Sequence, residues 1–293
     1  MRYRPFARTG MAVSALSLKL NGENDERQAR DWRELLHAAF EEGVNAFELV
    51  QPSHALLRGF AEGASSVKRS LLFVALRLNS GLEGQGVVDW VDEMMEEAGL
   101  EEVNLLNVDI ADTATISVTA AMRWMKDEHM AHRLGAFGAG EALTEPVEMG
   151  QFDAVVAPFN LLSGWRERNM VRRALETQMG VIACDPCPPA LMHRAEDAKA
   201  QSKGGWFKKV EALAGAGSYA FLKSTPNWTA EQICLGYALT EPAVASVQVE
   251  VSGPKHLASL AEVTDRGLPS AVSAQIEMAR FSTEREAASR RRA

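Results

Sequence analysis

The sequence predicts a single (β/α)8 barrel that spans residues 1–293, and three observations lead to this fold class. Short apolar runs of strand length alternate with amphipathic stretches of helix length, which is the pattern of a parallel sheet covered by helices. Eight such runs occur, and no change in composition separates two domains. Barrels of this class occupy about 250 residues as one unit, so the chain length of 293 residues also fits.

The eight expected strands are short, apolar and rich in β-branched residues, and each gives way to a loop or to helical periodicity. They are Ala15–Leu20, Ala46–Val50, Leu71–Leu78, Val103–Ile110, Arg133–Phe137, Ala154–Leu161, Gly180–Cys184 and Ser246–Val251.

Helical periodicity is clearest in Glu26–Glu42, where Trp32, Leu35, Leu36 and Phe40 recur at spacings of three and four on one face. The same pattern indicates further helices between the later strands. They are Val87–Ala98, Ala114–Lys126, Arg166–Thr177, Thr229–Leu239 and Lys255–Val263.

Three segments lie outside the repeat. Met1–Val13 is typical of a hairpin that precedes the first barrel strand, and Leu268–Arg292 predicts an extra C-terminal helix. Pro186–Asn227 is a long connection after the seventh strand, and connections of that length are usually functional. At the end of this connection, Thr229 and Gln232 have the spacing of a capping box, which predicts where the next helix begins.

The composition excludes several classes of protein. Apolar residues make up 46% of the chain and charged residues 24%, as in globular proteins with a large core. A net charge of -8 argues against nucleic-acid binding, since the one basic run, Arg290–Arg292, is terminal. No stretch reaches the roughly 20 apolar residues of a membrane span, and Met1–Leu20 lacks a signal-peptide core. Three cysteines indicate a reducing compartment, so we expect a cytoplasmic protein.

Several motifs occur in an order that resembles the aldo-keto reductase family. The opening YRPFARTGMAVSALSL is similar to the start of that family, and EEGVNAFELV resembles its second-strand motif. PFNLLS resembles the family's sixth strand and GVIACDPCPPAL its seventh. The last such segment, WTAEQICLGYALTEPAVASVQVEVSGPKHLASL, is similar to the family's final helix, strand and helix. The resemblance covers nearly the whole chain and implies a barrel related to NADPH-dependent carbonyl reductases.

The resemblance also locates the four side chains that the family uses for catalysis, and all four differ here. The family's aspartate falls on Glu48 and its proton-donating tyrosine on Ser53. Its lysine falls on Arg77 and its histidine on Asn107. We therefore expect a catalytically degenerate member of the family.

These four changes have different chemical weight. Glu48 and Arg77 retain opposite charges, so an ion pair across the barrel mouth is expected to persist. A serine hydroxyl at Ser53 is far less acidic than a phenol, whose pKa is about 10, and its side chain is shorter. Arg77 stays protonated at any useful pH, unlike a lysine. His54 is the one replacement acid at hand, because its imidazole titrates near neutrality, although the start of a helix suits a surface histidine equally well.

The resemblance places the family's nicotinamide cofactor on residues that are mostly apolar here. Glu250 replaces the glycine that opens the phosphate loop, so its carboxylate would repel a cofactor phosphate. Lys255 and His256 lie close enough in sequence to offset part of that repulsion. The remaining positions carry the carboxamide pair, the strand glutamine, the stacking aromatic residue and the adenine contact of the family. They fall on Phe137, Gly138, Val156, Cys184 and Leu260.

Cys184 and Cys187 have the C-x-x-C spacing of a redox or metal pair, and His193 follows a few residues later. A zinc site needs about four ligands, and the one further cysteine, Cys234, belongs to a helix placed far away in the barrel order. We therefore expect these thiols to fill space at the strand end and expect no metal, while a redox or metal role stays a third, minor interpretation.

The altered proton donor and the altered cofactor positions together favour a non-catalytic barrel that serves as a scaffold, assembly or regulatory subunit of a protein complex. Another protein is the expected partner, bound by the helices or the Pro186–Asn227 connection, and no cofactor is expected. The alternative is an NADPH-dependent aldo/keto oxidoreductase with an altered active site, in which His54 or Arg77 replaces the usual acid. Trp165 and Trp206 are expected on loops at the mouth, as part of an interface or a pocket wall.

Overall fold

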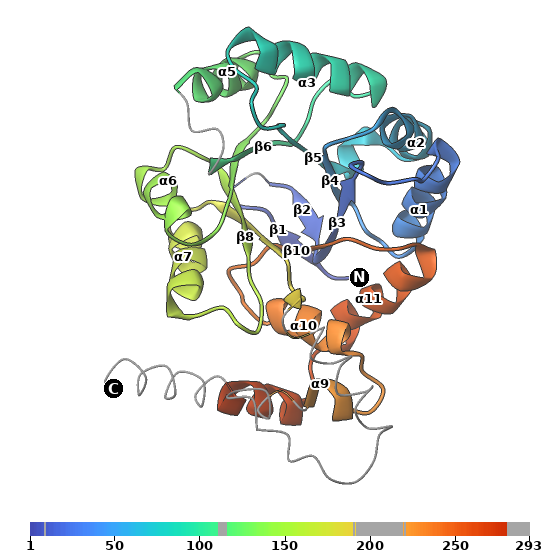
Figure 1. Ribbon diagram of the computed structural model, residues 1–293, viewed down its shortest axis with the longest axis vertical. Helices are drawn as coiled ribbons and strands as arrows, with labels where there is room; N and C mark the ends of the chain where they lie inside the picture. Colours follow the sequence, from blue (N-terminus) through green and yellow to red (C-terminus); the bar gives the residue numbers. More distant parts are fainter. Residues whose placement is uncertain (9, 111–115, 190, 192–218, 220, 280–293) are drawn as a thin grey trace.

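The computed structural model describes residues 1–8, 10–110, 116–189, 191, 219 and 221–279, and they form a barrel (Figure 1). Eight parallel strands close in the order β10-β3-β4-β5-β6-β7-β8-β9, and helices surround them. The predicted fold class is confirmed. The strands are β3 (Leu16–Asn21), β4 (Ala46–Val50), β5 (Phe73–Arg77), β6 (Leu105–Asp109), β7 (Leu134–Phe137), β8 (Ala154–Pro158), β9 (Gly180–Cys184) and β10 (Ser246–Val249).

Each predicted strand has a counterpart, although some boundaries were too wide. The predicted strand Leu71–Leu78 starts at Phe73, because Arg69–Leu71 forms a 3-10 turn that Arg69 closes with a hydrogen bond to the Leu72 carbonyl, 2.9 Å long. Three other strands end before the predicted residue, at Asp109, Pro158 and Val249. Apolar residues continue past these ends and pack in loops, so hydrophobicity alone misplaces the boundaries.

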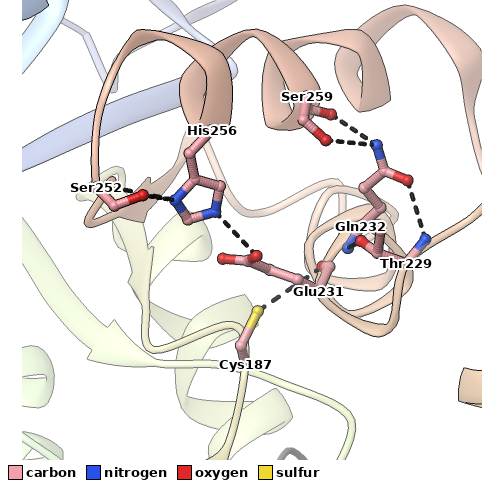
Figure 2. Close-up of polar contacts among 7 residues, drawn as sticks. All are labelled: Cys187, Thr229, Glu231, Gln232, Ser252, His256 and Ser259. Carbon is pink, nitrogen blue, oxygen red and sulfur yellow. Dashed lines mark hydrogen bonds and ion pairs between the residues drawn. The ribbon is translucent and has the colours of Figure 1, made fainter.

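The helices lie outside the strands and bury one face against them. They are α1 (Ala29–Glu41), α2 (His54–Ala64), α3 (Gln85–Glu97), α5 (Ile116–Asp127), α6 (Thr144–Met149), α7 (Trp165–Glu176), α9 (Phe221–Ser224), α10 (Ala230–Ala238) and α11 (Pro254–Arg266). The predicted capping box is present, since Thr229 Oγ1 accepts from the Gln232 amide at 3.1 Å and Gln232 Oε1 from the Thr229 amide at 3.0 Å (Figure 2). Sequence periodicity gave no range for α2 and did not indicate the short α6.

The predicted N-terminal hairpin consists of β1 (Tyr3–Pro5) and β2 (Ala12–Ser14), which pair antiparallel across one end of the barrel (Figure 1). Phe6 follows β1, is fully buried, and packs edge-on against Phe73 with ring centroids 4.7 Å apart. Phe73 and Gly180 are the first residues of β5 and β9, so Phe6 closes the N-terminal end of the barrel. The opposite, C-terminal end is the mouth, where barrel enzymes place their chemistry.

Residues 270–279 are helical, as expected for the first part of the predicted C-terminal helix. The rest of that prediction, including Arg290–Arg292, lies outside the described residues. So does most of the Pro186–Asn227 connection, with His193 and Trp206. No helix in the described part of the chain is long and apolar enough to cross a membrane.

Candidate functional site

Four polar side chains meet just inside the barrel mouth, and Glu48 lies at their centre. Arg77 donates from Nε to Glu48 Oε1 at 3.0 Å and from Nη2 to Oε2 at 2.6 Å. Asn107 Nδ2 donates to Oε1 at 2.7 Å, and Gln248 Nε2 donates to Oε2 at 2.6 Å. Strands β4, β5, β6 and β10 supply these four residues, which we call the Glu48 cluster. It contains three of the four residues that the resemblance placed at the catalytic positions.

The Glu48 cluster is a closed hydrogen-bonding unit. An ionised carboxylate has about four acceptor positions, and the four bonds to Glu48 use all of them. The Glu48 side chain is 2% exposed, so neither water nor a substrate competes for these positions. Glu48 therefore has no acceptor position left for a ligand.

Arg77 is held from a second direction by Phe137. The guanidinium carbon lies 3.7 Å from the centroid of the Phe137 ring, which is the geometry of a cation–π contact. The resemblance placed one of the carboxamide-binding residues of the family at Phe137. In this chain that position presents a ring whose face is already covered by Arg77.

Asn107 reaches Glu48 because Gly135 leaves room for it on the neighbouring strand. A Cβ atom at Gly135 would lie 1.9 Å from Asn107 Oδ1, well inside any possible contact. The same Oδ1 atom has no hydrogen-bond partner among the described residues. The carbonyl oxygen of the Asn107 amide is thus packed without a hydrogen bond, and the amide nitrogen makes the bond to Glu48.

Sequence reasoning missed two residues at the mouth, Gln248 and Lys19. Gln248 is 200 positions from Glu48 in the chain, and its only signal was a polar residue within the apolar run Ser246–Val251. Lys19 is on β3 and pairs with Glu250 through an Nζ–Oε1 distance of 2.5 Å. The positive charge of Lys19 therefore offsets the Glu250 carboxylate, which the resemblance placed beside the cofactor phosphates.

Ser53 and His54, the other two candidate catalytic residues, have surface contacts at the start of α2. Ser53 is the N-cap residue, and its Oγ accepts from the Leu56 amide at 3.2 Å. The imidazole of His54 bonds through Nδ1 to Glu97 of α3 at 2.7 Å, and its side chain is 83% exposed. Both side chains thus have partners on α2 and α3, and the Glu48 cluster is assembled without them.

Two cavities open at the mouth and share Lys19 and Arg77 as a common wall. The first, of about 280 Å³, also has Phe137, Cys184 and Glu250 in its wall. Three candidate cofactor positions therefore do come together around one space. The second cavity, of about 320 Å³, is bounded by the β3, β4, β5 and β6 loops.

The other candidate cofactor positions are filled or buried. Val156 is fully buried in the barrel interior, and Leu260 is fully buried on α11. The Gly138 amide donates to the Val156 carbonyl at 3.1 Å, so this backbone group serves the barrel itself. A dinucleotide cofactor would meet no polar side chain at Val156 or Leu260, where the family has an amide.

Cys184 and Cys234 are buried, and Cys187 is half-buried between them in the chain. The thiols of Cys187 and Cys234 form a hydrogen bond, and this bond together with burial raises the pKa of Cys187. Burial also raises the pKa of Cys184. The prediction that Cys234 is distant was wrong, because its helix α10 leads into β10, the neighbour of β9, and Cys187 also contacts the Glu231 carbonyl of α10 at 3.7 Å. Within the described residues no three His, Cys, Asp or Glu side chains are grouped to hold a metal.

Glu231 and His256 join the first turns of α10 and α11 at the rim of the mouth (Figure 2). The Ser252 amide can only donate, so His256 Nδ1 is its acceptor at 3.2 Å and Nε2 carries the proton. His256 Nε2 then donates to Glu231 Oε2 at 2.9 Å. Beside it, Gln232 Nε2 donates to the Ser259 carbonyl at 2.7 Å. His256 is therefore tied to Glu231 rather than to Glu250.

Comparison with known proteins agrees with this architecture. Residues 17–280 match the family model described as Aldo/keto reductase family. Among solved structures, the chain is similar to the holo form of aldo-keto reductase AKR11C1 from Bacillus halodurans, with a TM-score of 0.74 and 13% identity. That likeness covers 95% of this chain and 96% of the other, and at this identity it shows the fold alone. No curated protein matches the chain in sequence.

Proposed function

This chain belongs to the aldo/keto reductase family, and we propose that within it the chain acts as a non-catalytic barrel, a scaffold, assembly or regulatory subunit of a protein complex. The observation that carries this proposal is the closed Glu48 cluster. Four donors occupy the Glu48 carboxylate, and the residue at the family's tyrosine position, Ser53, is used to cap α2. General acid catalysis needs a donor positioned toward the substrate, and the side chains at these two positions are instead engaged in contacts within the barrel and at the start of α2.

The residues at the cofactor positions do not fit NADPH, which supports the same proposal. The Phe137 ring is covered by Arg77, and Glu250 places a carboxylate at the phosphate loop. We accordingly derive no step through a nicotinamide.

An exposed surface on the α6 and α7 side supports the protein partner. Trp165 begins α7 with 70% of its side-chain surface exposed, and Leu162 just before it is also exposed. Next to Trp165 lies a surface cavity of about 560 Å³ between α6 and α7. Exposed tryptophans are enriched at protein interfaces and often dominate their energetics. The free thiols of Cys184, Cys187 and Cys234 support a cytoplasmic location for the complex.

Two measurements on the full chain test the proposal. Titration with NADPH, followed by tryptophan fluorescence and calorimetry, is expected to show no micromolar binding. A tagged chain recovered from its own cells is expected to retain a partner that Trp165→Ala releases. The matched control is Trp124→Ala on α5, which removes another exposed tryptophan and should leave the partner bound. Micromolar NADPH affinity with carbonyl turnover would overturn the proposal.

The second candidate function is an NADPH-dependent oxidoreductase with an altered active site, and family membership itself favours it. The structure adds that Lys19 and Arg77 place two cationic groups in the wall of both mouth cavities. In this case NADPH must bind outside the family's mode. Lys19→Met would then abolish carbonyl reduction while Lys19→Arg retains NADPH binding. Absence of NADPH binding to the unmodified chain contradicts this candidate.

A further inference from the structure

We propose that Cys187 and Cys234 form a redox site, in which a small hydroperoxide oxidises the two thiols to an intramolecular disulfide. The thiols form a hydrogen bond between two separate elements, since Cys187 follows β9 and Cys234 is in α10. Both are free thiols in this structure, which therefore describes the reduced form of the site. The pair differs from the C-x-x-C pair that the sequence spacing indicated.

A second contact holds Cys187 against the same part of α10. The Cys187 thiol lies 3.7 Å from the Glu231 carbonyl oxygen (Figure 2). Cys234 is three positions after Glu231 in this helix, which is about one turn further on. Both contacts thus place the Cys187 sulfur at one turn of α10. Disulfide geometry is demanding, and two thiols that already touch need little movement to reach it.

Cys184 has a different environment, although it is closer to Cys187 in the chain. It is the last residue of β9, its side chain is buried, and its thiol donates to Asp185 Oδ2 at 3.8 Å. Asp185 has a left-handed backbone conformation, with φ at 48°, so the chain changes direction directly after Cys184. Of the two thiols in the C-x-x-C segment, Cys187 is the one whose neighbour is another thiol.

The first mouth cavity gives an oxidant access to Cys187, which is half-buried and contributes to the cavity wall. Cys234 is fully buried, so the reaction begins at Cys187. A hydroperoxide, ROOH, transfers one oxygen atom to the Cys187 sulfur and leaves as ROH, which gives a sulfenic acid. The Cys234 sulfur then attacks the oxidised sulfur, the S–O bond breaks, and water leaves with the Cys234 proton. Two thiols and one ROOH become one disulfide, ROH and water.

The surroundings of the pair set the rates of the two steps. The hydrogen bond to Cys234 and burial raise the pKa of Cys187, so little reactive thiolate is present at neutral pH and the first step is slow. The second step is intramolecular between groups already in contact, so it outpaces further oxidation of Cys187. The site therefore responds to sustained oxidant. The disulfide joins α10 to the segment after β9 and fixes the part of the cavity wall that Cys187 and Glu231 form.

The inference goes beyond the proposed scaffold function and does not depend on it, because neither thiol belongs to the Trp165 surface. The full chain is incubated with hydrogen peroxide under mildly alkaline conditions, and its remaining thiols are then alkylated in denaturant. Peptide mapping by mass spectrometry without reductant is expected to show a Cys187–Cys234 disulfide. Two of the three thiols should be lost, and dithiothreitol should restore both.

Variants separate this pair from general thiol oxidation. Cys234→Ala removes the second thiol, so the disulfide should be lost and Cys187 should continue to a sulfinic acid, a gain of two oxygen atoms in its peptide. Cys184→Ala also removes a buried thiol and is the matched control, because it should leave the yield of the Cys187–Cys234 disulfide unchanged. Circular dichroism checks that each variant is folded, and the peptide map of the unmodified chain decides the question if Cys234→Ala is not.

Three results overturn the proposal. The first is a disulfide between Cys184 and Cys187, or between two chains, in place of the expected one. The second is a native chain that forms no disulfide in peroxide. The third is loss of the disulfide in Cys184→Ala, which would place Cys184 in the site.

Discussion

Arg77 spans both carboxylate oxygens of Glu48, with Nε 3.0 Å from Oε1 and Nη2 2.6 Å from Oε2. Both side chains are buried, and the pair has the parallel, two-bond geometry in which an arginine binds a carboxylate most strongly. A lysine at this position would offer a single charge on a flexible chain. Arg77 therefore holds Glu48 in one fixed geometry.

Arg77→Met is expected to lower the free energy of unfolding by about 3–5 kcal/mol, because it leaves the Glu48 charge buried without its counterion. Denaturant unfolding followed by circular dichroism measures the change. Adding Glu48→Leu should recover part of the loss, since no buried charge then remains. Arg30→Met, which removes an exposed pair with Glu34 on α1, is the control and should leave the free energy of unfolding nearly unchanged. A recovery of zero in the double variant would contradict this account.

Gly135→Ala is expected to destabilise the barrel by about 1–3 kcal/mol, because the new Cβ atom overlaps Asn107. Asn107 must then move away from Glu48. Gly138→Ala, three residues later and just past the end of β7, is the control, because the nearest atom to a new Cβ there is in Leu143 at 3.5 Å. Thermal unfolding of the two variants should differ clearly. Equal melting temperatures would show that the Asn107 side chain adopts another conformation that avoids the new Cβ atom.

Gly180→Ala is expected to be severely destabilising, since atoms of the Phe6 ring lie 2.4 Å from the position of its Cβ. Phe6→Leu alone should also destabilise, because it removes the aromatic contact with Phe73. The smaller side chain of Phe6→Leu leaves room for the Cβ atom of Gly180→Ala. The double variant should therefore be more stable than the sum of the single effects predicts. If the two destabilising effects were strictly additive, the Phe6 ring would not be in contact with Gly180. Gly86→Ala in α3, where a Cβ meets no atom within 4 Å, should be neutral or stabilising.

The buried thiols predict how stability depends on pH. The pKa values of Cys184 and Cys187 are raised above the ordinary value of 9.0, so both thiols stay protonated in the folded chain when they ionise in the unfolded one. The unfolded state then binds fewer protons, and stability is present below pH 9 and falls as the pH rises above it. The slope is about 1.4 kcal/mol per pH unit for each thiol. Unfolding titrations from pH 7 to pH 10 measure it.

Replacing Cys184 and Cys187 with alanine should flatten that slope, while the cost of the lost packing appears at every pH. Alkylation provides a second measurement, because the thiolate is the reactive form. Native thiols should react slowly at neutral pH and all three should react in denaturant. Rapid labelling of the native chain at pH 7 would contradict the pKa direction.

Periodicity predicted the barrel because each strand and helix is recognised from a pattern within about 10 to 20 residues. Every expected strand has a counterpart in the structure. The resemblance also predicted that Glu48 and Arg77 form an ion pair, as they do. The capping box at Thr229 was visible because both of its residues lie in one turn. Local patterns of this kind need no knowledge of the rest of the chain.

The parts that sequence reasoning missed are contacts between distant segments. Gln248 joins Glu48 only when the barrel closes, and Cys187 meets Cys234 only when α10 packs beside the segment that follows β9. Neither pairing leaves a spacing signal. The strand ends were misjudged for a related reason, because apolar residues continue into loops that are buried by tertiary packing.

Closure of the barrel also determines when the protein can complete its folding. The first barrel strand to be synthesised, β3, pairs with the last, β10, through Leu16 and Val247. The hairpin that precedes β3 depends on the same late segment, since the Arg4 side chain donates to the Val244 carbonyl at 2.6 Å. Pairings at such sequence separation form slowly. On the ribosome, β3 therefore keeps one edge unpaired until nearly 250 residues have been made, and that edge is the one that a chaperone is expected to protect.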